Sequence, residues 1–221
     1  MAEEFMTDDE QFEAAKQWLA SNGLFLVGGA VLAAVVFFGW RYYDGTRNER
    51  DLKASAQFSA LAAAVEKDDR NGASKLATDL VATYPGTPYA DQAELTLARL
   101  AVDAGTPGNA IAPLTHVMKE SKDAELQNVA RLRLARIQID QGKPDDAIAT
   151  LTGADSAAFA ARFHEVRGDA LYAKKDLTGA AGEYRAALGA SDPRSLDAAI
   201  LQLKISDLGV SPAPIVMKGK S

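Results

Sequence analysis

Residues 23–40 read GLFLVGGAVLAAVVFFGW, and no charged residue interrupts these 18 positions. As a helix with a rise of about 1.5 Å per residue, the run would be about 27 Å long, close to the hydrocarbon thickness of a bilayer. Amphipathic rings, which favour the headgroup region, flank the run at Trp18, Trp40, Tyr42 and Tyr43. The segment 23–40 therefore predicts a single transmembrane helix in contact with membrane lipid.

Two other interpretations of the run are a buried core helix and a cleavable signal peptide. A core helix usually keeps a polar stripe, and this run has none. A signal peptide has a basic start, a shorter apolar stretch and a small-residue cleavage site. Here residues 1–22 carry a net charge of −5, and Trp-Arg-Tyr-Tyr closes the run. We therefore expect an uncleaved anchor preceded by an acidic segment, residues 1–22.

The composition of the chain favours helices and excludes several classes of site. Alanine, a strong helix former and a poor strand former, fills 43 of the 221 positions. There is no cysteine, which excludes disulfides, thiolate zinc sites, iron–sulfur clusters and a cysteine nucleophile. The net charge is −6 and no basic stripe is visible, so we expect no nucleic-acid partner.

Small residues recur after residue 41 at the spacing of a helical-hairpin repeat. Three pairs lie 12 positions apart, namely Ala98 and Ala110, Ala135 and Ala147, and Gly168 and Ala180. Leu61 and Ala73 form a weaker first copy. Two antiparallel helices approach closely only where their crossing points carry small side chains. The pattern predicts an all-α fold in which residues 41–209 form a tetratricopeptide-like solenoid after the transmembrane helix.

The last helix of this domain is expected at residues 194–208, with Asp192 and Pro193 at its start. It would cap the open end of the last hairpin with an apolar face made of Leu196, Ala199, Ile200, Leu203 and Leu208. Residues 210–221 lack periodicity and are predicted to be a disordered tail.

Signals for catalysis, cofactors and metals are missing from the sequence. His116 and His164 fall in different repeats, and neither has a second histidine at metal-ligand spacing. There is no phosphate loop, no Rossmann glycine pattern and no nucleophile elbow. We therefore predict no catalytic residue, no cofactor, no metal site and no enzymatic activity.

The remaining functional feature is a surface, the concave groove lined by the first helix of each hairpin. One column in this groove matters most, because Arg99 and Arg136 occupy equivalent positions in neighbouring repeats. Their guanidinium groups, flanked by apolar side chains, could hold a carboxylate or a row of backbone carbonyls. The alternative is an ordinary solvated face with local salt bridges. The predicted groove residues are Leu95, Arg99, Val102, Leu132, Arg136, Ile139, Glu165, Asp169 and Tyr172.

The order of these parts resembles the YfgM family, the ancillary subunits of the SecYEG translocon in Gram-negative bacteria. The resemblance is carried by QWLASNG at 17–23, GWRYY at 39–43, LRLARIQ at 132–138, RGDAL at 167–171 and LQLKI at 201–205. It implies a single-pass type II protein of the bacterial inner membrane with a periplasmic repeat domain. It also implies association with the SecYEG translocon and a PpiD-like membrane chaperone, in the service of newly exported client proteins.

The charges that flank the apolar run oppose this topology. Only Lys16 lies on the N-terminal side, whereas the C-terminal side carries Arg41, Arg47, Arg50 and Lys53. Because basic residues favour the cytoplasmic side, the charges alone place the repeats in the cytoplasm. Long domains can cross the membrane against such a bias, so we follow the resemblance: N-terminus cytoplasmic, repeats periplasmic. The alternative is a membrane-tethered scaffold or assembly factor for a membrane complex, with cytoplasmic repeats.

Overall fold

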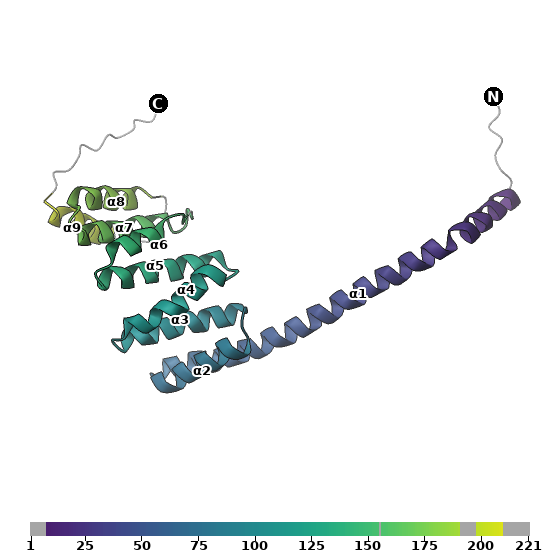
Figure 1. Cartoon of the computed structure of the whole chain (residues 1–221), viewed down its shortest axis with the longest axis horizontal. Coiled ribbons are helices and arrows are strands. Elements are labelled where there is room, and N and C mark those ends of the chain that lie inside the picture. The colour runs from purple at the N-terminus through teal and green to yellow at the C-terminus, as the bar shows by residue number, and fades with distance from the viewer. Residues whose placement is uncertain (1–7, 155, 191–197, 210–221) are drawn as a thin grey trace, which may run out of the picture. The chain divides into compact units, whose positions relative to one another are not determined.

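The computed structural model describes residues 8–154, 156–190 and 198–209, and all regular structure in these ranges is helical (Figure 1). The predicted all-α fold with a long apolar N-terminal helix is thus confirmed. The elements are α1 (Asp8–Glu66), α2 (Arg70–Thr83), α3 (Pro88–Asp103), the 3-10 helix η1 (Pro107–Ala110), α4 (Ile111–Glu120), α5 (Ala124–Asp140), α6 (Pro144–Leu151), α7 (Ala160–Ala173), α8 (Leu177–Gly189) and α9 (Ala198–Asp207).

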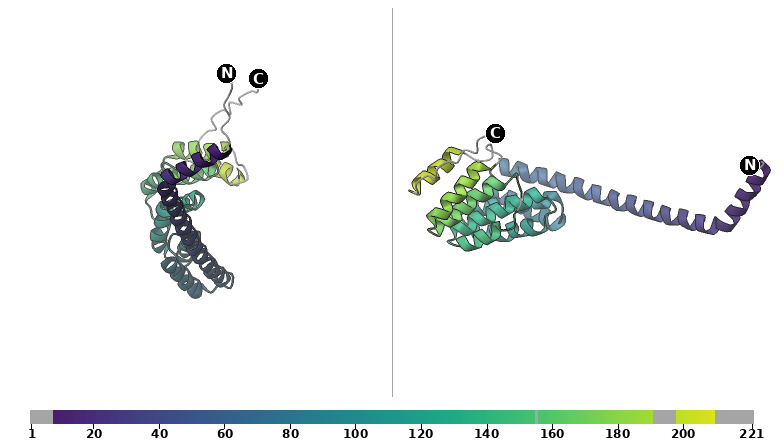
Figure 2. Two further views of the ribbon diagram at one scale, coloured as in Figure 1. Left: turned by 90° about the vertical axis from the view of Figure 1, so that its right-hand side faces the viewer. Right: turned by 90° about the horizontal axis from the view of Figure 1, so that it is seen from above.

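The chain divides into two compact units between Lys53 and Ala54. Within the first unit, α1 contains the segment Gln11–Tyr42, which by length and mean hydropathy, 2.2, is able to cross a membrane. Its apolar side chains are exposed; Leu24 is 85% and Phe25 80% accessible. The helix has a bend near its N-terminal end (Figure 2). Ser21 and Asn22 there bond to the carbonyl of Trp18, a contact of the kind that bends helices.

The second unit begins inside α1, so the division falls within the predicted repeat domain 41–209. The start of that domain at residue 41 stays a prediction. Three predicted parts lie outside the described residues. They are residues 1–7 of the acidic segment, residues 192–197 at the predicted start of the last helix, and the predicted tail 210–221.

Helical hairpins stack in chain order in the second unit, from the end of α1 with α2 through α3–α4 and α5–α6 to α7–α8 (Figure 1). The predicted small residues lie at the crossings, and the five alanines of the three main pairs are at most 2% exposed. Larger side chains four positions beyond each crossing fill the space toward the next helix. Leu114 and Leu151 are among them, and burying each contributes about 1.5–3 kcal/mol. The first hairpin also follows the pattern, since Leu61, Ala73 and Ala77 share one core cluster.

Gly168 marks the closest approach of two helices. A Cβ atom at this position would lie 2.5 Å from the Tyr184 ring of α8, which is too short for any real contact. The ring is itself buried and cannot move aside easily, because its hydroxyl donates a hydrogen bond to Asp169 at 2.7 Å. Glycine is therefore required here by packing rather than by backbone conformation.

The turn inside each hairpin has the same geometry in all four copies. The residue five positions before the second small residue adopts a left-handed conformation, and the next residue is the N-cap of the following helix. The amide of that next residue donates to the carbonyl five positions back, as in a Schellman motif, at 2.8–3.0 Å. The left-handed residues are Asp68 (φ 53°), Gly105 (φ 72°), Gly142 (φ 73°) and Lys175 (φ 67°).

The capping helix is present as α9 and packs on α8, but of the predicted face that the structure describes only Leu208 is buried. Leu201 and Leu208 are buried and Ile205 is partly buried, whereas Leu203 is 60% exposed. The predicted Ile200 is also half exposed, and Leu196 lies outside the described residues. Apart from Leu208, the prediction chose the wrong stripe of the helix, because the sequence of α9 is apolar on more than one side and only the contact with α8 selects among them.

Candidate partner-binding surface

The structure separates the nine predicted groove residues into three groups. Leu95 and Leu132 are 7% and 3% exposed and belong to the core between helices, and Ile139 is partly buried against the same core. Arg99, Val102 and Arg136 line one cavity. Glu165, Asp169 and Tyr172 lie at the other end of the same face, beside α9. The groove is therefore not one continuous strip of accessible side chains.

We call the first site the arginine cavity. It has a volume of about 370 Å³ and lies between α3, α4 and α5. Both buried and exposed apolar side chains of these helices line it. Three guanidinium groups and one carboxylate form the polar part of the lining. The residues are Ala98, Arg99, Val102, Leu114, Arg133, Arg136, Ile137 and Asp140.

The three arginines are unequally neutralised. Arg99 lies 4.0 Å from Asp103, and Arg136 lies 3.8 Å from Glu165, so both ion pairs are long. Among the described residues Arg133 has no ion pair, and it donates only a long hydrogen bond, 3.4 Å, to the carbonyl of Leu95. Burial, followed by the charges of Arg99 and Arg136, lowers the pKa of Arg133. The cavity thus holds positive charge that an anionic group would stabilise.

Arg133 was not among the predicted groove residues, although the sequence contains a signal for it. Arg133 and Arg136 are three residues apart on α5 and so lie on one face of the helix. The column that selected Arg99 and Arg136 follows only one position per repeat. If both arginines of LRLAR at 132–136 had been considered, the sequence would have predicted two guanidinium groups at this site.

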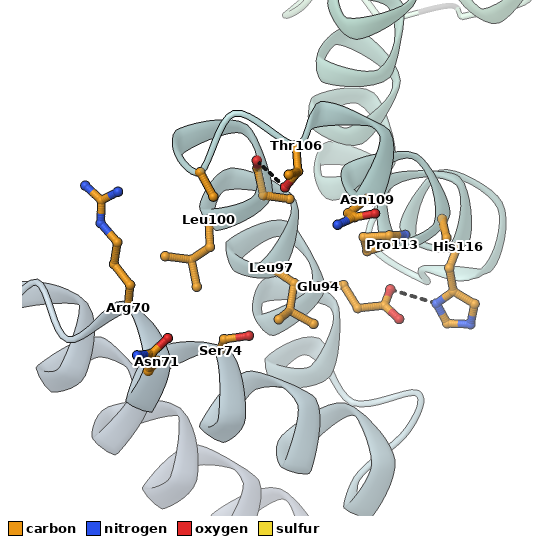
Figure 3. A pocket seen from close by; sticks show the side chains of 13 residues that line it. Arg70, Asn71, Ser74, Glu94, Leu97, Leu100, Thr106, Asn109, Pro113 and His116 are labelled. Carbon is orange, nitrogen blue, oxygen red and sulfur yellow. Dashed lines mark hydrogen bonds and ion pairs between the residues drawn. The ribbon is translucent and has the colours of Figure 1, made fainter.

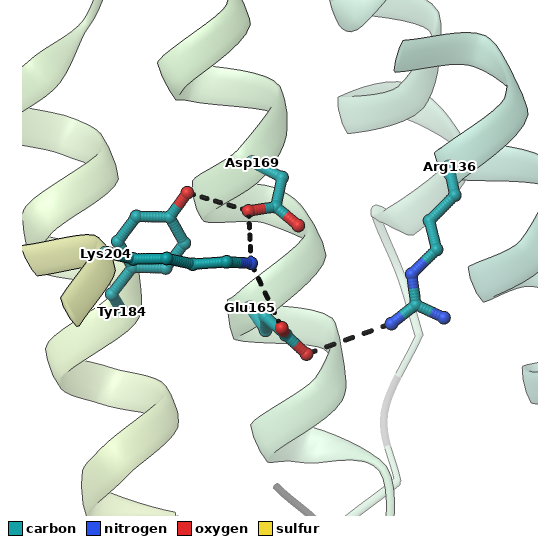
Figure 4. A network of polar contacts seen from close by, with 5 residues as sticks. All are labelled: Arg136, Glu165, Asp169, Tyr184 and Lys204. Carbon is teal, nitrogen blue, oxygen red and sulfur yellow. Dashed lines mark hydrogen bonds and ion pairs between the residues drawn. The ribbon is translucent and has the colours of Figure 1, made fainter. Parts of the chain in front are cut away.

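The acidic residues at the other end of the face are already bound within the chain (Figure 4). Lys204 of α9 lies 2.8 Å from Asp169 and 3.1 Å from Glu165. The Tyr184 hydroxyl donates to the same carboxylate oxygen of Asp169, and burial followed by this hydrogen bond raises the pKa of Tyr184. Glu165 also faces Arg136, so it connects the arginine cavity with α9.

A second cavity, of about 640 Å³, contains none of the predicted groove residues (Figure 3). It lies between α2, α3 and α4, and its floor includes Leu97 and Leu100. At one side, Glu94 is almost fully buried, and its carboxylate lies 2.8 Å from Nδ1 of His116. Burial raises the pKa of Glu94 and outweighs the hydrogen bond and charge of His116, which lower it. Sequence reasoning missed this pair because its members are 22 positions apart.

Each histidine of the chain contacts a glutamate rather than a second histidine. His164 Nδ1 lies 2.7 Å from Glu183, in the same manner as His116 and Glu94. Across the described ranges, no group of three or more histidine, cysteine or acidic side chains is placed to hold a metal ion. These pairs act as contacts between the two helices of a hairpin.

The chain is similar to known proteins over nearly its whole length. A family model described as a tetratricopeptide repeat-like domain matches residues 16–210. The ancillary SecYEG translocon subunit of Escherichia coli (strain K12) is 30% identical over 209 residues, which cover 93% of this chain and 98% of that protein. The protein of the same name from Haemophilus influenzae is 27% identical over 201 residues, covering 91% of this chain and 97% of that one. No solved structure matches the chain significantly.

These similarities include both the apolar helix and the stacked hairpins. The family match begins before the apolar run and ends just after α9. The chain belongs to the YfgM family, the ancillary SecYEG translocon subunits with a tetratricopeptide repeat-like domain.

Proposed function

We propose that this chain is a membrane-anchored protein-binding subunit that works beside the SecYEG translocon. The relatives carry this association in their name, and the stacked hairpins are a scaffold that presents side chains to other proteins. The observation that carries the proposal is the arginine cavity, an accessible apolar hollow with three guanidiniums and long, incomplete ion pairs. Its partner would place a carboxylate among the arginines and an apolar side chain on the floor.

The exposed apolar helix supports membrane attachment. Between Leu24 and Trp40 the large apolar side chains of α1 are 45–85% exposed, and water is a poor solvent for a helix that is apolar on every side. A bilayer covers such a helix, and residues 23–40 have the length to span it. Attachment also raises the local concentration of membrane partners, so weak contacts in the arginine cavity suffice for capture.

The orientation in this proposal is an N-terminus in the cytoplasm and a repeat domain in the periplasm, at the inner membrane. There the repeats meet newly exported proteins and a PpiD-like membrane chaperone, while the anchor keeps them near the translocon exit. The proposal assigns no catalytic step to the chain and needs no cofactor.

A second candidate, a membrane-tethered scaffold with cytoplasmic repeats, is favoured by the flanking charges. Four basic residues lie at positions 41–53, directly after the apolar run, whereas only one lies before it. The two candidates differ in topology, which a single engineered cysteine reports because the chain has none of its own.

The test labels intact spheroplasts with a membrane-impermeant maleimide. Thr178→Cys lies on the exposed surface of α8, and Thr7→Cys lies on the other side of the anchor. Our proposal expects Thr178→Cys to react before lysis and Thr7→Cys only after lysis. The reverse pattern would contradict it and favour the cytoplasmic scaffold.

A further inference from the structure

The contact between α9 and the last hairpin is formed by a specific recognition of lysine. Lys204 extends over the ring of Tyr184, 5.3 Å from its centroid, and its ammonium group reaches Asp169 and Glu165 on α7 (Figure 4). Two carboxylates and an aromatic face are together a strong environment for an ammonium ion. Burial alone would lower the pKa of Lys204, but the hydrogen bonds and charges of the two acids outweigh it and leave the pKa raised.

Apolar contacts of α9 complete a short sequence motif. Leu201 precedes Lys204 by three positions, Ile205 follows it directly, and Leu208 follows it by four. These three side chains pack on Tyr184, Ala187 and neighbouring residues of α7 and α8. The face of α7 and α8 under α9 therefore selects the pattern Leu-x-x-Lys-Ile-x-x-Leu on a helix, and we call this face the α9 seat.

The fit of α9 in its seat is incomplete. A cavity of about 260 Å³ remains beside Asp169, Tyr172, Tyr184 and Lys204. Within the described residues α9 has ten positions, and Leu203 on its other side is 60% exposed. A short helix with few buried side chains gains little over the entropy cost of ordering it, so its docking is readily reversed.

One side chain, Glu165, links the seat to the arginine cavity. Glu165 is shared between Lys204 of α9 and Arg136 of the cavity, at 3.1 Å and 3.8 Å. A partner that crosses this face of the repeats from α3 toward α7 therefore meets α9 at its far end.

We propose that the α9 seat is a docking site for an amphipathic helix of a partner protein that presents lysine between leucines, and that α9 occupies the seat until this helix displaces it. The occupant is argued from α9 itself, whose side chains show the chemistry that the seat accepts. The inference rests on the proposed function in one respect, that the chain binds proteins. In this proposal α9 competes with the partner helix for the α9 seat, and it also caps the last hairpin.

The experiment uses the full chain in detergent and a fluorescent peptide with the sequence of residues 198–209, AAILQLKISDLG. In the Lys204→Gln variant α9 loses its two ion pairs, so the peptide should bind saturably to the vacated seat. The wild-type chain should bind it about tenfold more weakly, because its own α9 competes. A peptide with glutamine in place of lysine should bind neither chain. Hydrogen exchange of α9 should rise in Lys204→Gln while that of α7 stays low.

Acid variants test whether the named carboxylates carry the recognition. Adding Asp169→Asn and Glu165→Gln to Lys204→Gln should abolish peptide binding, whereas adding Glu125→Gln, on the exposed start of α5, should not. Leu201→Ala serves as a second way to loosen α9. Failure of the peptide to bind either loosened chain, or binding that ignores the acid variants, would overturn the proposal.

A dimer of the loosened chain in light scattering, in place of peptide binding, would also overturn the proposal, since the seat would then serve a second copy. No translocon component is present in these measurements. A negative result here therefore leaves the proposed function standing, and loss of translocon binding elsewhere does not affect this test.

Discussion

Single residues decide how closely the helices of a hairpin approach. At Gly168 the missing side chain is what allows α7 to touch the Tyr184 ring, and the ring in turn orients its hydroxyl toward Asp169. Gly182, on α8 of the same hairpin, is exposed and has open space where a Cβ would be. The two glycines therefore form a matched pair that separates packing from helix propensity.

Gly168→Ala should lower the free energy of unfolding, and Gly182→Ala should raise it. Alanine improves helix propensity by about 1 kcal/mol at either position. At Gly168 that gain is outweighed by overpacking, which costs about 1–3 kcal/mol and here displaces a hydrogen-bonded ring. Urea denaturation followed by circular dichroism of the full chain in detergent measures both changes. A gain in stability at both positions would show that the ring moves freely, contrary to this account.

Glu94 links stability to pH. Because burial raises its pKa in the folded chain, its contribution to stability is fully present below about pH 4.5, the ordinary value for glutamate, and is lost as the pH rises through the folded-state pKa. The unfolding free energy of the wild type, minus that of Glu94→Gln, should therefore increase as the pH falls. A difference that is flat with pH would contradict this.

Among the elements, the four hairpin turns carry the most regular feature of the repeat. Two of them place glycine at the left-handed position, while Asp68 and Lys175 occupy it in the other two. A residue with a Cβ pays about 1–2 kcal/mol in this conformation, although aspartate tolerates it better than most. The turn before α8 is therefore the strained copy.

Lys175→Gly should stabilise the chain by about 1 kcal/mol, and Gly142→Ala should destabilise it by about 1–2 kcal/mol. Nothing lies within 4 Å of a Cβ at Gly142, so its cost is purely one of backbone conformation. Lys175 loses only a distant contact with the Tyr172 ring, 5.8 Å from the centroid. Thermal unfolding of the two variants provides the measurement. Equal shifts of the same sign would mean that the left-handed residue is not the source of strain.

Elements also show which parts of the fold and site could be predicted from sequence. The hairpins were predictable because small residues must recur wherever two helices cross, and Ala98, Ala135 and Gly168 obey that rule. The stripe of α9 that is buried was not predictable, because only its contact with α8 distinguishes Leu201 from Leu203. Within the site, Arg99 and Arg136 share a column and were predictable. The pairing of Lys204 with Asp169 joins residues 35 positions apart and has no local signal.

At the scale of the whole molecule, an exposed apolar helix and a folded repeat unit belong to one chain. The repeat unit supplies a positively charged hollow on a protein whose net charge is −6, so this charge is local and not a consequence of composition. Arg99 and Arg136 are about half exposed, so a partner that covers the hollow would remove water from their guanidinium groups and strengthen the ion pair with its carboxylate. The arginine cavity is therefore a surface suited to bind a partner's carboxylate.

Capture of the translocon by the full chain is the most direct test of this account. The chain, tagged and extracted from membranes in mild detergent, is compared as wild type and as the triple variant Arg99→Gln, Arg133→Gln and Arg136→Gln. A control triple variant, Lys67→Gln, Lys119→Gln and Lys122→Gln, removes the same charge from exposed positions elsewhere. Far-ultraviolet circular dichroism verifies that each variant is folded.

The account predicts that the arginine variant co-purifies about tenfold less SecYEG, since loss of one charged hydrogen bond costs about 1.5–3 kcal/mol, while the lysine control captures as much as the wild type. Undiminished capture by a folded arginine variant would contradict the assignment of the arginine cavity as the docking point.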